Sequence, residues 1–307
     1  MNTGNKIVLE KHIVSGVTDD KTRIYDYLVG KFDIISSRKG IKKAFKRKQI
    51  LLNGTYASSA SYVKNDDKIE LLQLNVSSNK TYPLELKVLF EDDEIAIVNK
   101  PAGLIVSGNK FKTLQNALQP NLKKSNAKDK LPNPLTTHRL DSQTSGLVIV
   151  AKTYSSRIKI GEMFENRQIH KSYHAIVQGK LEGSGEINTV VQAKMAKTLY
   201  QSLQIVDSVK NEFVSLIKLS PVTGRKHQIR IHLSSLGFPI VGDKLYGETD
   251  NILKRKGLFL AATSLTFEHP KTDELLKFDI PLPDKFESFL NREQNWKDRI
   301  NTKKENL

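Results

Sequence analysis

The sequence predicts an α+β protein with a mostly antiparallel sheet, preceded by a small unit that contains a basic helix and a hairpin. Short apolar runs alternate with turn residues, as in strands joined by hairpins. Helical patterns occur singly between these runs and do not form the regular strand–helix repeat of a parallel sheet. The 307 residues exceed one small domain, which favours about two domains.

The first 75 residues hold a basic helix and a compact hairpin. Seven of the eleven residues from Arg38 to Lys48 are Lys or Arg. Ser36 or Ser37 can cap a helix there, and Ile41, Ala44 and Phe45 follow at helical spacing. A basic helix of this kind suits phosphate binding, although a solvated helix face explains the charges equally well. The candidate RNA contacts on it are Arg38, Lys39, Lys42 and Lys43.

The hairpin and the later elements follow from the apolar runs. Ile50–Leu52 meets Asn53-Gly54, a strong hairpin turn signal, and a strand resumes over 68–71. Beyond the polar segment 74–83, strands are expected over 84–88, 95–98, 147–151, 173–177, 213–219 and 259–262, and helices over 158–164 and 227–236. The segment Gln119–Thr137 holds three prolines and is expected to be a functional or mobile loop. The charged tail after Leu290 is expected to fray.

Composition narrows the class of protein. The net charge of +16 and the pI of about 9.7 favour a polyanionic partner. A solubilising surface charge and a membrane surface remain alternatives, and charge alone does not separate RNA from DNA. No apolar run is long enough to span a membrane, and no signal segment is recognisable at the N-terminus. The absence of cysteine fits a cytoplasmic protein.

The first cluster that could carry chemistry is Thr137–Gly146, just before an apolar strand. Asp141 follows His138 and Arg139 in a turn rich in Ser, Thr and Gly. Neighbouring cationic groups can hold such a carboxylate ionised and in place. On local features alone, a purely turn-shaping role of Asp141 is the more common explanation.

The second and third clusters lie downstream. In an extended segment, Lys171 and Tyr173 share one face, and a tyrosine facing a cleft can stack on a base; an ordinary strand tyrosine is the alternative. In the third cluster, a helix is expected from about His227 to Leu236, with Ile229, Leu233 and Leu236 as its buried stripe. Arg230 lies about 100° from that stripe, so it could pair with Asp141 or remain a surface arginine.

Other chemistries lack their residues. His227 and His232 point about 140° apart on a helix, so they cannot share a metal ion, and the pair His170 and His174 lacks further ligands; no metal is expected. The sequence contains no phosphate-binding P-loop and no nucleophile elbow. A zinc deaminase would need His-x-Glu and Cys-x-x-Cys ligands that are absent.

Taken together, the three clusters resemble the RluA-type family of pseudouridine synthases. The matching segments are 97–103, 138–146, 171–175, 224–233, 236–243, 246–247 and 265–270. They cover roughly residues 84–290 in the family's order and spacing. One departure is the segment 104–108, where many relatives place a His-Pro pair.

The resemblance implies an RNA pseudouridine synthase whose α+β catalytic domain has a mixed, largely antiparallel sheet and a central RNA-binding cleft, preceded by a small α/β RNA-binding domain. It implies no cofactor. Asp141 would be the catalytic aspartate, Tyr173 would stack on the uracil, and Arg230 would pair with Asp141. Arg139 would help fill the gap left when the target uridine leaves the RNA stack. The further RNA contacts that we expect in the cleft are His138, Arg225 and His227.

The N-terminal part resembles the S-four-like RNA-binding domain, on the segments 22–28, 37–39, 50–54 and 65–69. The expected organisation is an RNA-binding domain over 1–75, a linker over 76–83, a catalytic domain over 84–290 and a charged tail over 291–307. The implied partner is RNA, ribosomal or transfer, with ribosomal RNA of the large subunit the commonest target of relatives with this domain. DNA is not expected, and the protein is expected to be a monomer. A non-catalytic RNA-binding or ribosome-assembly protein on the same scaffold is the alternative.

Overall fold

The protein forms two compact units in a computed structural model that describes residues 7–73, 81–247 and 257–305. One unit comprises Met1–Asn79 with Lys128–Pro132, and the other comprises Lys80–Ala127 with Asn133–Leu307. Most of the linker expected over 76–83 lies outside the described residues. The assignment of the first unit to an S-four-like domain stays a prediction.

The first unit contains an antiparallel sheet in the order β1-β4-β2-β3 and two short helices. Its elements are β1 (Val8–Ile13), α1 (Ile24–Tyr27), α2 (Arg38–Lys46), β2 (Ile50–Leu52), β3 (Thr55–Tyr56) and β4 (Lys68–Leu72). The Ser37 hydroxyl accepts a hydrogen bond from Gly40 N at 3.1 Å and caps α2, as predicted. Asn53 and Gly54 both have positive φ and turn the β2–β3 hairpin.

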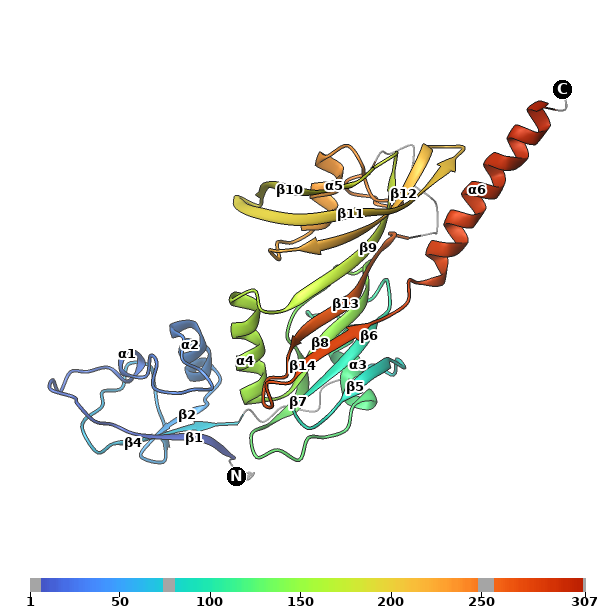
Figure 1. Ribbon diagram of the computed structural model, residues 1–307. Helices are drawn as coiled ribbons and strands as arrows, with labels where there is room; N and C mark the ends of the chain where they lie inside the picture. Colours follow the sequence, from blue (N-terminus) through green and yellow to red (C-terminus); the bar gives the residue numbers. More distant parts are fainter. Residues whose placement is uncertain (1–6, 74–80, 248–256, 306–307) are drawn as a thin grey trace. The chain divides into compact units, whose positions relative to one another are not determined.

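The second unit is organised around one ten-stranded sheet (Figure 1). The strand order is β10-β11-β12-β9-β13-β8-β6-β5, with β14 beside β13 and β7 beside β8. The strands are β5 (Lys87–Glu91), β6 (Ile95–Lys100), β7 (Lys130–Thr136), β8 (Ser145–Thr153), β9 (His170–Gln178), β10 (Ser184–Val191), β11 (Lys194–Ser208), β12 (Glu212–Pro221), β13 (Leu260–Glu268) and β14 (Leu275–Asp279). β13 and β8 run parallel, whereas β13 and β9, like β6 and β8, run antiparallel. The predicted α+β fold with a mixed, largely antiparallel sheet is confirmed.

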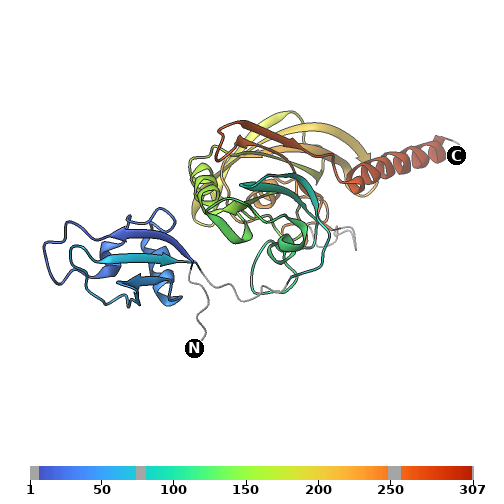
Figure 2. The same cartoon turned by 90° about the horizontal axis from the view of Figure 1, so that it is seen from below.

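In the described part of this unit, four helices accompany the sheet: α3 (Leu114–Asn121), α4 (Tyr154–Glu165), α5 (Gln228–Ser235) and α6 (Asp284–Glu305). The hydroxyls of Thr113 and Thr153 accept backbone hydrogen bonds that cap α3 and α4. Helix α4 packs against β8, α5 against β10 and β11, and α6 against β11. Figure 2 shows the twist of the sheet from below.

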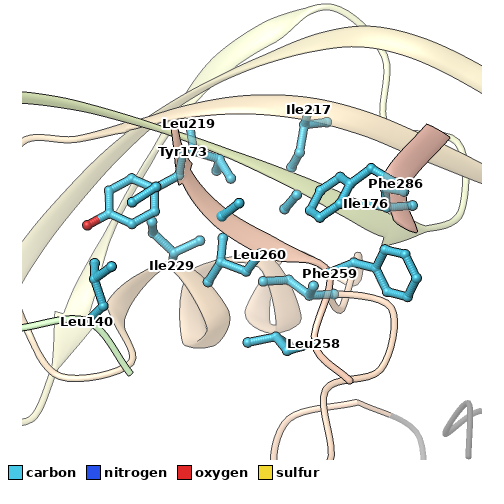
Figure 3. Packing of buried hydrophobic residues seen from close by; sticks show 14 of the residues in the cluster. Leu140, Tyr173, Ile176, Ile217, Leu219, Ile229, Leu258, Phe259, Leu260 and Phe286 are labelled. Carbon is cyan, nitrogen blue, oxygen red and sulfur yellow. The ribbon is translucent and has the colours of Figure 1, made fainter. Parts of the chain in front are cut away.

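The core of the second unit joins the sheet to α5 and to the start of α6. Figure 3 shows part of it, with Ile176 and Ile217 on neighbouring strands and Phe259 close to Phe286. The rings of Phe259 and Phe286 lie 5.4 Å apart, and Phe286 is fully buried. Burial of these large side chains stabilises the region that carries the cavity described below.

The structure corrects three sequence predictions. Strand β7 lies inside the expected loop 119–137. Pro132 and Pro134 are two residues apart, so their missing N–H groups fall on the same edge of the strand. The N–H groups of the alternate residues point to the other edge, and the strand can still pair with β8. The chain after Leu290 does not fray but continues as α6, since the described segment contains no helix breaker and Phe289 and Leu290 are buried at its base. Leu236 is 40% exposed and does not belong to the buried stripe of α5, which ends at Ser235.

Within the described part of the chain, no helix combines the length and apolar character needed to cross a membrane.

Candidate active site

A cavity of about 1090 Å³ opens in the second unit. Its lining comes from the loop before β8, from α4, from β9 and from the segment that joins β12 to α5. It includes Thr137, His138, Arg139, Leu140, Asp141, Phe164, Lys171, Tyr173, Arg225, His227, Ile229 and Arg230. The three clusters picked out from the sequence therefore meet in one place. The cavity is large enough for a nucleotide, since small-molecule sites span about 300–1,000 Å³.

Asp141 sits in a tight turn between β7 and β8. Thr144 N donates to Asp141 O at 3.1 Å, and the neighbouring Leu140 is buried. Gly103 N donates to Ser142 O at 2.7 Å and ties the turn to the segment after β6. The side chain of Asp141 is 19% exposed, so its carboxylate faces the cavity with only partial access to water.

The segment Thr137–Gly146 ends in a glycine because no larger residue fits at position 146. Its φ is +123°, and a Cβ atom there would lie 2.0 Å from Ala262 O on β13. That contact belongs to the parallel pairing of β8 with β13. Only glycine permits so close a backbone approach, which fixes the position where the Asp141 turn enters the sheet.

Arg230 is buried and has two carboxylate partners. Its Nε and Nη2 each donate to Asp243 at 2.7 Å, whereas Nη1 lies 3.5 Å from Asp141 Oδ2. Burial opposes the charge of Arg230, but the hydrogen bonds and charge of Asp243, together with Asp141, hold the pKa of Arg230 above its usual range. The guanidinium was expected to pair with Asp141, and the structure places it there; its closer partner is Asp243.

Asp243 was not singled out as a site residue from the sequence. It is 2% exposed and accepts four hydrogen bonds: two from Arg230 and one each from Leu245 N and Tyr246 N. Burial raises the pKa of Asp243, but these hydrogen bonds outweigh burial and leave that pKa below its usual value. The available signal was Gly242-Asp243, a glycine with φ of +79° that turns the chain directly before an acid.

His227 lies on the other side of Asp141. Its Nε2 is 3.6 Å from Asp141 Oδ1, and its Nδ1 is 2.9 Å from the Tyr246 hydroxyl. The residue has φ of +58° and stands directly before α5, a left-handed conformation that turns the chain into the helix. Burial lowers the pKa of His227, and Arg230 adds to that effect against the opposing charge of Asp141.

Tyr173 projects from β9 with 9% of its surface exposed. In Figure 3 its ring lies at one end of the apolar cluster near Leu219 and Ile229, with the hydroxyl pointing away from them. Burial raises the pKa of the Tyr173 phenol well above its usual value, and the charge of Asp141 raises it further. The phenol therefore keeps its proton at neutral pH.

His138 is a neutral histidine in this arrangement. Its Nε2 accepts a hydrogen bond from Ile149 N at 3.0 Å, and its ring lies 5.1 Å from the ring of Phe164. Burial, with a smaller contribution from the charge of Lys171, lowers the pKa of His138 to about 3. His138 therefore brings no positive charge to the cavity, whereas the adjacent Arg139 is exposed at its lining.

Lys100 is a second residue that the sequence analysis did not single out. It is fully buried, and its Nζ donates to the carbonyls of Pro101, Leu104 and Ser142 at 2.9, 2.8 and 3.2 Å. Burial lowers the pKa of Lys100 to about 8, against the opposing charge of Asp141. Lys100 thereby joins the end of β6 to the Asp141 turn.

The remaining basic candidates fall in different places. Arg225 lines the cavity, and its buried Nε has no hydrogen-bond partner in the described part of the chain. Four exposed residues lie on α2 of the first unit and are not among the residues that line the cavity: Arg38, Lys39, Lys42 and Lys43. Among the described residues, no cluster of three or more His, Asp or Glu side chains is arranged to hold a metal ion.

Comparison with known proteins gives a consistent family. The family described as RNA pseudouridylate synthase matches residues 94–235. "Ribosomal large subunit pseudouridine synthase D" of Nitrosomonas europaea is 32% identical over 286 residues, which cover 84% of this chain and 81% of that protein. "Ribosomal large subunit pseudouridine synthase C" of Rickettsia felis is also 32% identical, over 79% of this chain and 88% of that protein.

The solved structures agree. "Human RNA Pseudouridylate Synthase Domain Containing 1" has a TM-score of 0.54 at 26% identity, covering 64% of this chain and 83% of that chain. The matched family region, 94–235, contains Asp141, Tyr173 and Arg230, while Asp243 lies just beyond it. The chain therefore belongs to the RluA-type family of RNA pseudouridine synthases, isomerases that make pseudouridine in RNA.

Proposed function

We propose that the protein converts specific uridines of large-subunit ribosomal RNA into pseudouridine, with Asp141 as the essential catalytic residue. The proposed substrate is supported by relatives whose names specify the ribosomal large subunit. A further relative, from Vibrio parahaemolyticus, is named "Dual-specificity RNA pseudouridine synthase RluA", and transfer RNA is therefore the alternative substrate. We propose that the enzyme acts in the cytoplasm and as a monomer.

The observation that carries the catalytic proposal is the environment of Asp141. One carboxylate oxygen faces Arg230 and the other faces His227, at 3.5 and 3.6 Å, at the wall of the cavity. An ionised carboxylate with a donor on each side is aimed and ready to react. A protein that only bound RNA would not require this arrangement.

The reaction breaks the bond between ribose C1′ and uracil N1, turns the base, and joins C1′ to uracil C5. C5 then loses its proton and the freed N1 gains one, so that the product is an isomer of the substrate. The base must first leave the RNA stack, at a cost of a few kcal/mol. We assign Arg139 to the gap that the base leaves, because it is exposed at the cavity lining. Asp141 can attack the sugar, attack the base or remove a ribose proton, and each route needs its ionised form.

Tyr173 supports the bound uracil in this proposal. Its ring lies beside the cavity and offers a face on which the detached base can stack. Because its pKa is raised, the phenol cannot serve as a proton acceptor near neutral pH, so any proton that it handles is one that it donates.

The cavity is also suited to the phosphates that flank the target. Its lining carries Arg139, Arg167, Lys171, Arg225 and Lys226 besides the pair formed by Arg230. Burial lowers the pKa of Lys171, whose Nζ lies 5.3 Å from the centre of the Phe164 ring. A phosphate beside it would stabilise its charged form. We propose that α2 of the first unit adds affinity through further phosphate contacts.

The test is pseudouridine mapping of total RNA from wild type, from a gene deletion, and from the deletion complemented with Asp141→Asn. We expect one or a few ribosomal sites to vanish in the deletion and to return only with the wild-type gene. The matched control is Glu182→Gln, an exposed acid paired with Lys180 outside the cavity lining, which should restore every site. Full restoration by Asp141→Asn would contradict the catalytic proposal, and loss of sites in transfer RNA alone would correct the substrate.

A further inference from the structure

We propose that Tyr246 is a positioning residue whose hydroxyl fixes the tautomer of His227, so that the Nε2–H of His227 points at Asp141. This inference rests on the proposed catalytic role of Asp141. It concerns a tyrosine outside the cavity lining, which acts through the histidine and not on the substrate.

The tautomer follows from the two neighbours of the imidazole. A neutral histidine carries its proton on one ring nitrogen only. Nε2 faces the Asp141 carboxylate at 3.6 Å, and a lone pair there would repel the negative oxygen. The proton is therefore favoured on Nε2, which leaves Nδ1 as an acceptor for the Tyr246 hydroxyl at 2.9 Å.

Tyr246 is itself held from three other directions. Its backbone N donates to Asp243 Oδ1 at 3.2 Å, and its carbonyl accepts from the Ser234 hydroxyl at 2.7 Å. The Arg230 guanidinium lies 5.1 Å from the centre of its ring. The hydroxyl therefore has a defined position relative to α5, and Asp243 organises both donors that face Asp141.

The groups around His227 keep its imidazole neutral, and only a neutral imidazole has two tautomers. Asp141 faces it from the turn before β8, Arg230 from α5, Lys226 from the preceding position, and Asp243 from the turn that carries Tyr246. Burial is the largest influence and lowers the pKa of His227, so the imidazole is neutral at neutral pH. Without the tyrosine hydroxyl, a neutral His227 could place its proton on either nitrogen.

This reasoning predicts a pH-dependent defect in Tyr246→Phe, which keeps the ring and removes only the hydroxyl. At neutral pH the single-turnover rate should fall by about three- to tenfold, the effect of one hydrogen bond between neutral groups. As pH falls and His227 becomes protonated, both nitrogens carry hydrogen, so the defect should shrink towards none. RNA affinity should stay unchanged.

The experiment compares wild type, Tyr246→Phe and Tyr200→Phe from about pH 5 to about pH 8, on a transcript containing the mapped target uridine. Tyr200 lies on β11 outside the cavity lining, so its variant should match wild type throughout. Taking the rate ratio at each pH cancels the pH effects that the variant and wild type share. A ratio for Tyr246→Phe equal to one at neutral pH would overturn the inference.

The tautomer can be measured directly by ¹⁵N NMR on protein labelled at histidine, with His227→Gln to assign the signal. We expect the Nε2–H form in wild type and a mixture in Tyr246→Phe; an Nδ1–H form in wild type, or no change in the variant, would refute the proposal. The two proposals fail separately. If Asp141→Asn is fully active, the catalytic role fails while the NMR result still decides the tautomer.

Discussion

Replacement of Asp243 by Asn tests the partner that holds Arg230. Both guanidinium donors reach Asp243 at 2.7 Å, and the two side chains are only 1% and 9% exposed. An asparagine can offer one oxygen but must turn its NH₂ group towards the other donor, so one charge-assisted hydrogen bond is lost. Arg230 then keeps its charge with the more distant Asp141 as its remaining carboxylate partner.

The magnitude follows from this geometry. A hydrogen bond to a charged group contributes about 1.5–3 kcal/mol, and breaking a buried ion pair costs about 3–5 kcal/mol. Because one oxygen and a second carboxylate remain, we expect a loss of about 3 kcal/mol in the free energy of unfolding. The pKa of Asp243 lies below its usual value, so the contribution is complete above about pH 4 and disappears as pH falls through that lowered pKa.

Urea unfolding followed by circular dichroism measures this change. The control Glu182→Gln removes an exposed ion pair at 2.6 Å and should change the stability by less than about 1 kcal/mol. If Asp243→Asn costs no more than this control, Asp243 does not hold Arg230 in place.

Three further predictions follow from the geometry. Gly146→Ala should destabilise the protein by about 3 kcal/mol or more in urea unfolding, because its Cβ would meet a backbone oxygen at 2.0 Å. The control Gly161→Ala, which has open space around it in α4, should be neutral or stabilising. Equal stabilities of the two variants would contradict this. Arg139→Gln should reduce the salt slope of RNA binding by about one and His138→Gln should leave it unchanged, because only Arg139 is charged; a salt series that shows the reverse would contradict the neutral state of His138. The pKa of the buried Lys100 is lowered to about 8, so the unfolded state binds the lysine proton more tightly than the folded state does. The free energy of unfolding of wild type, relative to that of Lys100→Met, should therefore grow by at most about 3 kcal/mol from about pH 8 to about pH 10.5. A difference that stays constant with pH in denaturant titrations would exclude this.

The local features of the fold could be predicted because they depend on neighbours in sequence. Ser37 lies within reach of the donors of its own helix turn, and Asn53-Gly54 turns a hairpin through its own backbone preferences. The apolar runs predicted six of the ten strands of the large sheet, since period and composition are local properties, although the strand expected over 84–88 is shifted to Lys87–Glu91. Strands β10, β11 and β14 were not predicted. Strand β7 escaped this reasoning, because only its pairing with β8 makes a strand of a segment that contains two prolines.

The residues of the site could also be picked out from the sequence. Asp141, Tyr173 and Arg230 all lie within the region that the family matches, and the structure brings all three to one cavity. The protonation states of the site residues could not be predicted. The neutral His138 depends on burial beneath α4, where no sequence neighbour of the histidine decides its exposure.

The sequence by itself determined the chemistry that the chain can offer, its basic charge and the order of its elements, because these depend on composition and on short spacings. Only the tertiary structure decided that Asp243 is the closer partner of Arg230, that Tyr246 reaches His227, and that Lys100 joins the Asp141 turn to β6. Each of these contacts joins residues 13 to 42 positions apart. Their strength comes from burial and from donor–acceptor distances of 2.7 to 3.2 Å, which packing sets and a linear pattern does not record.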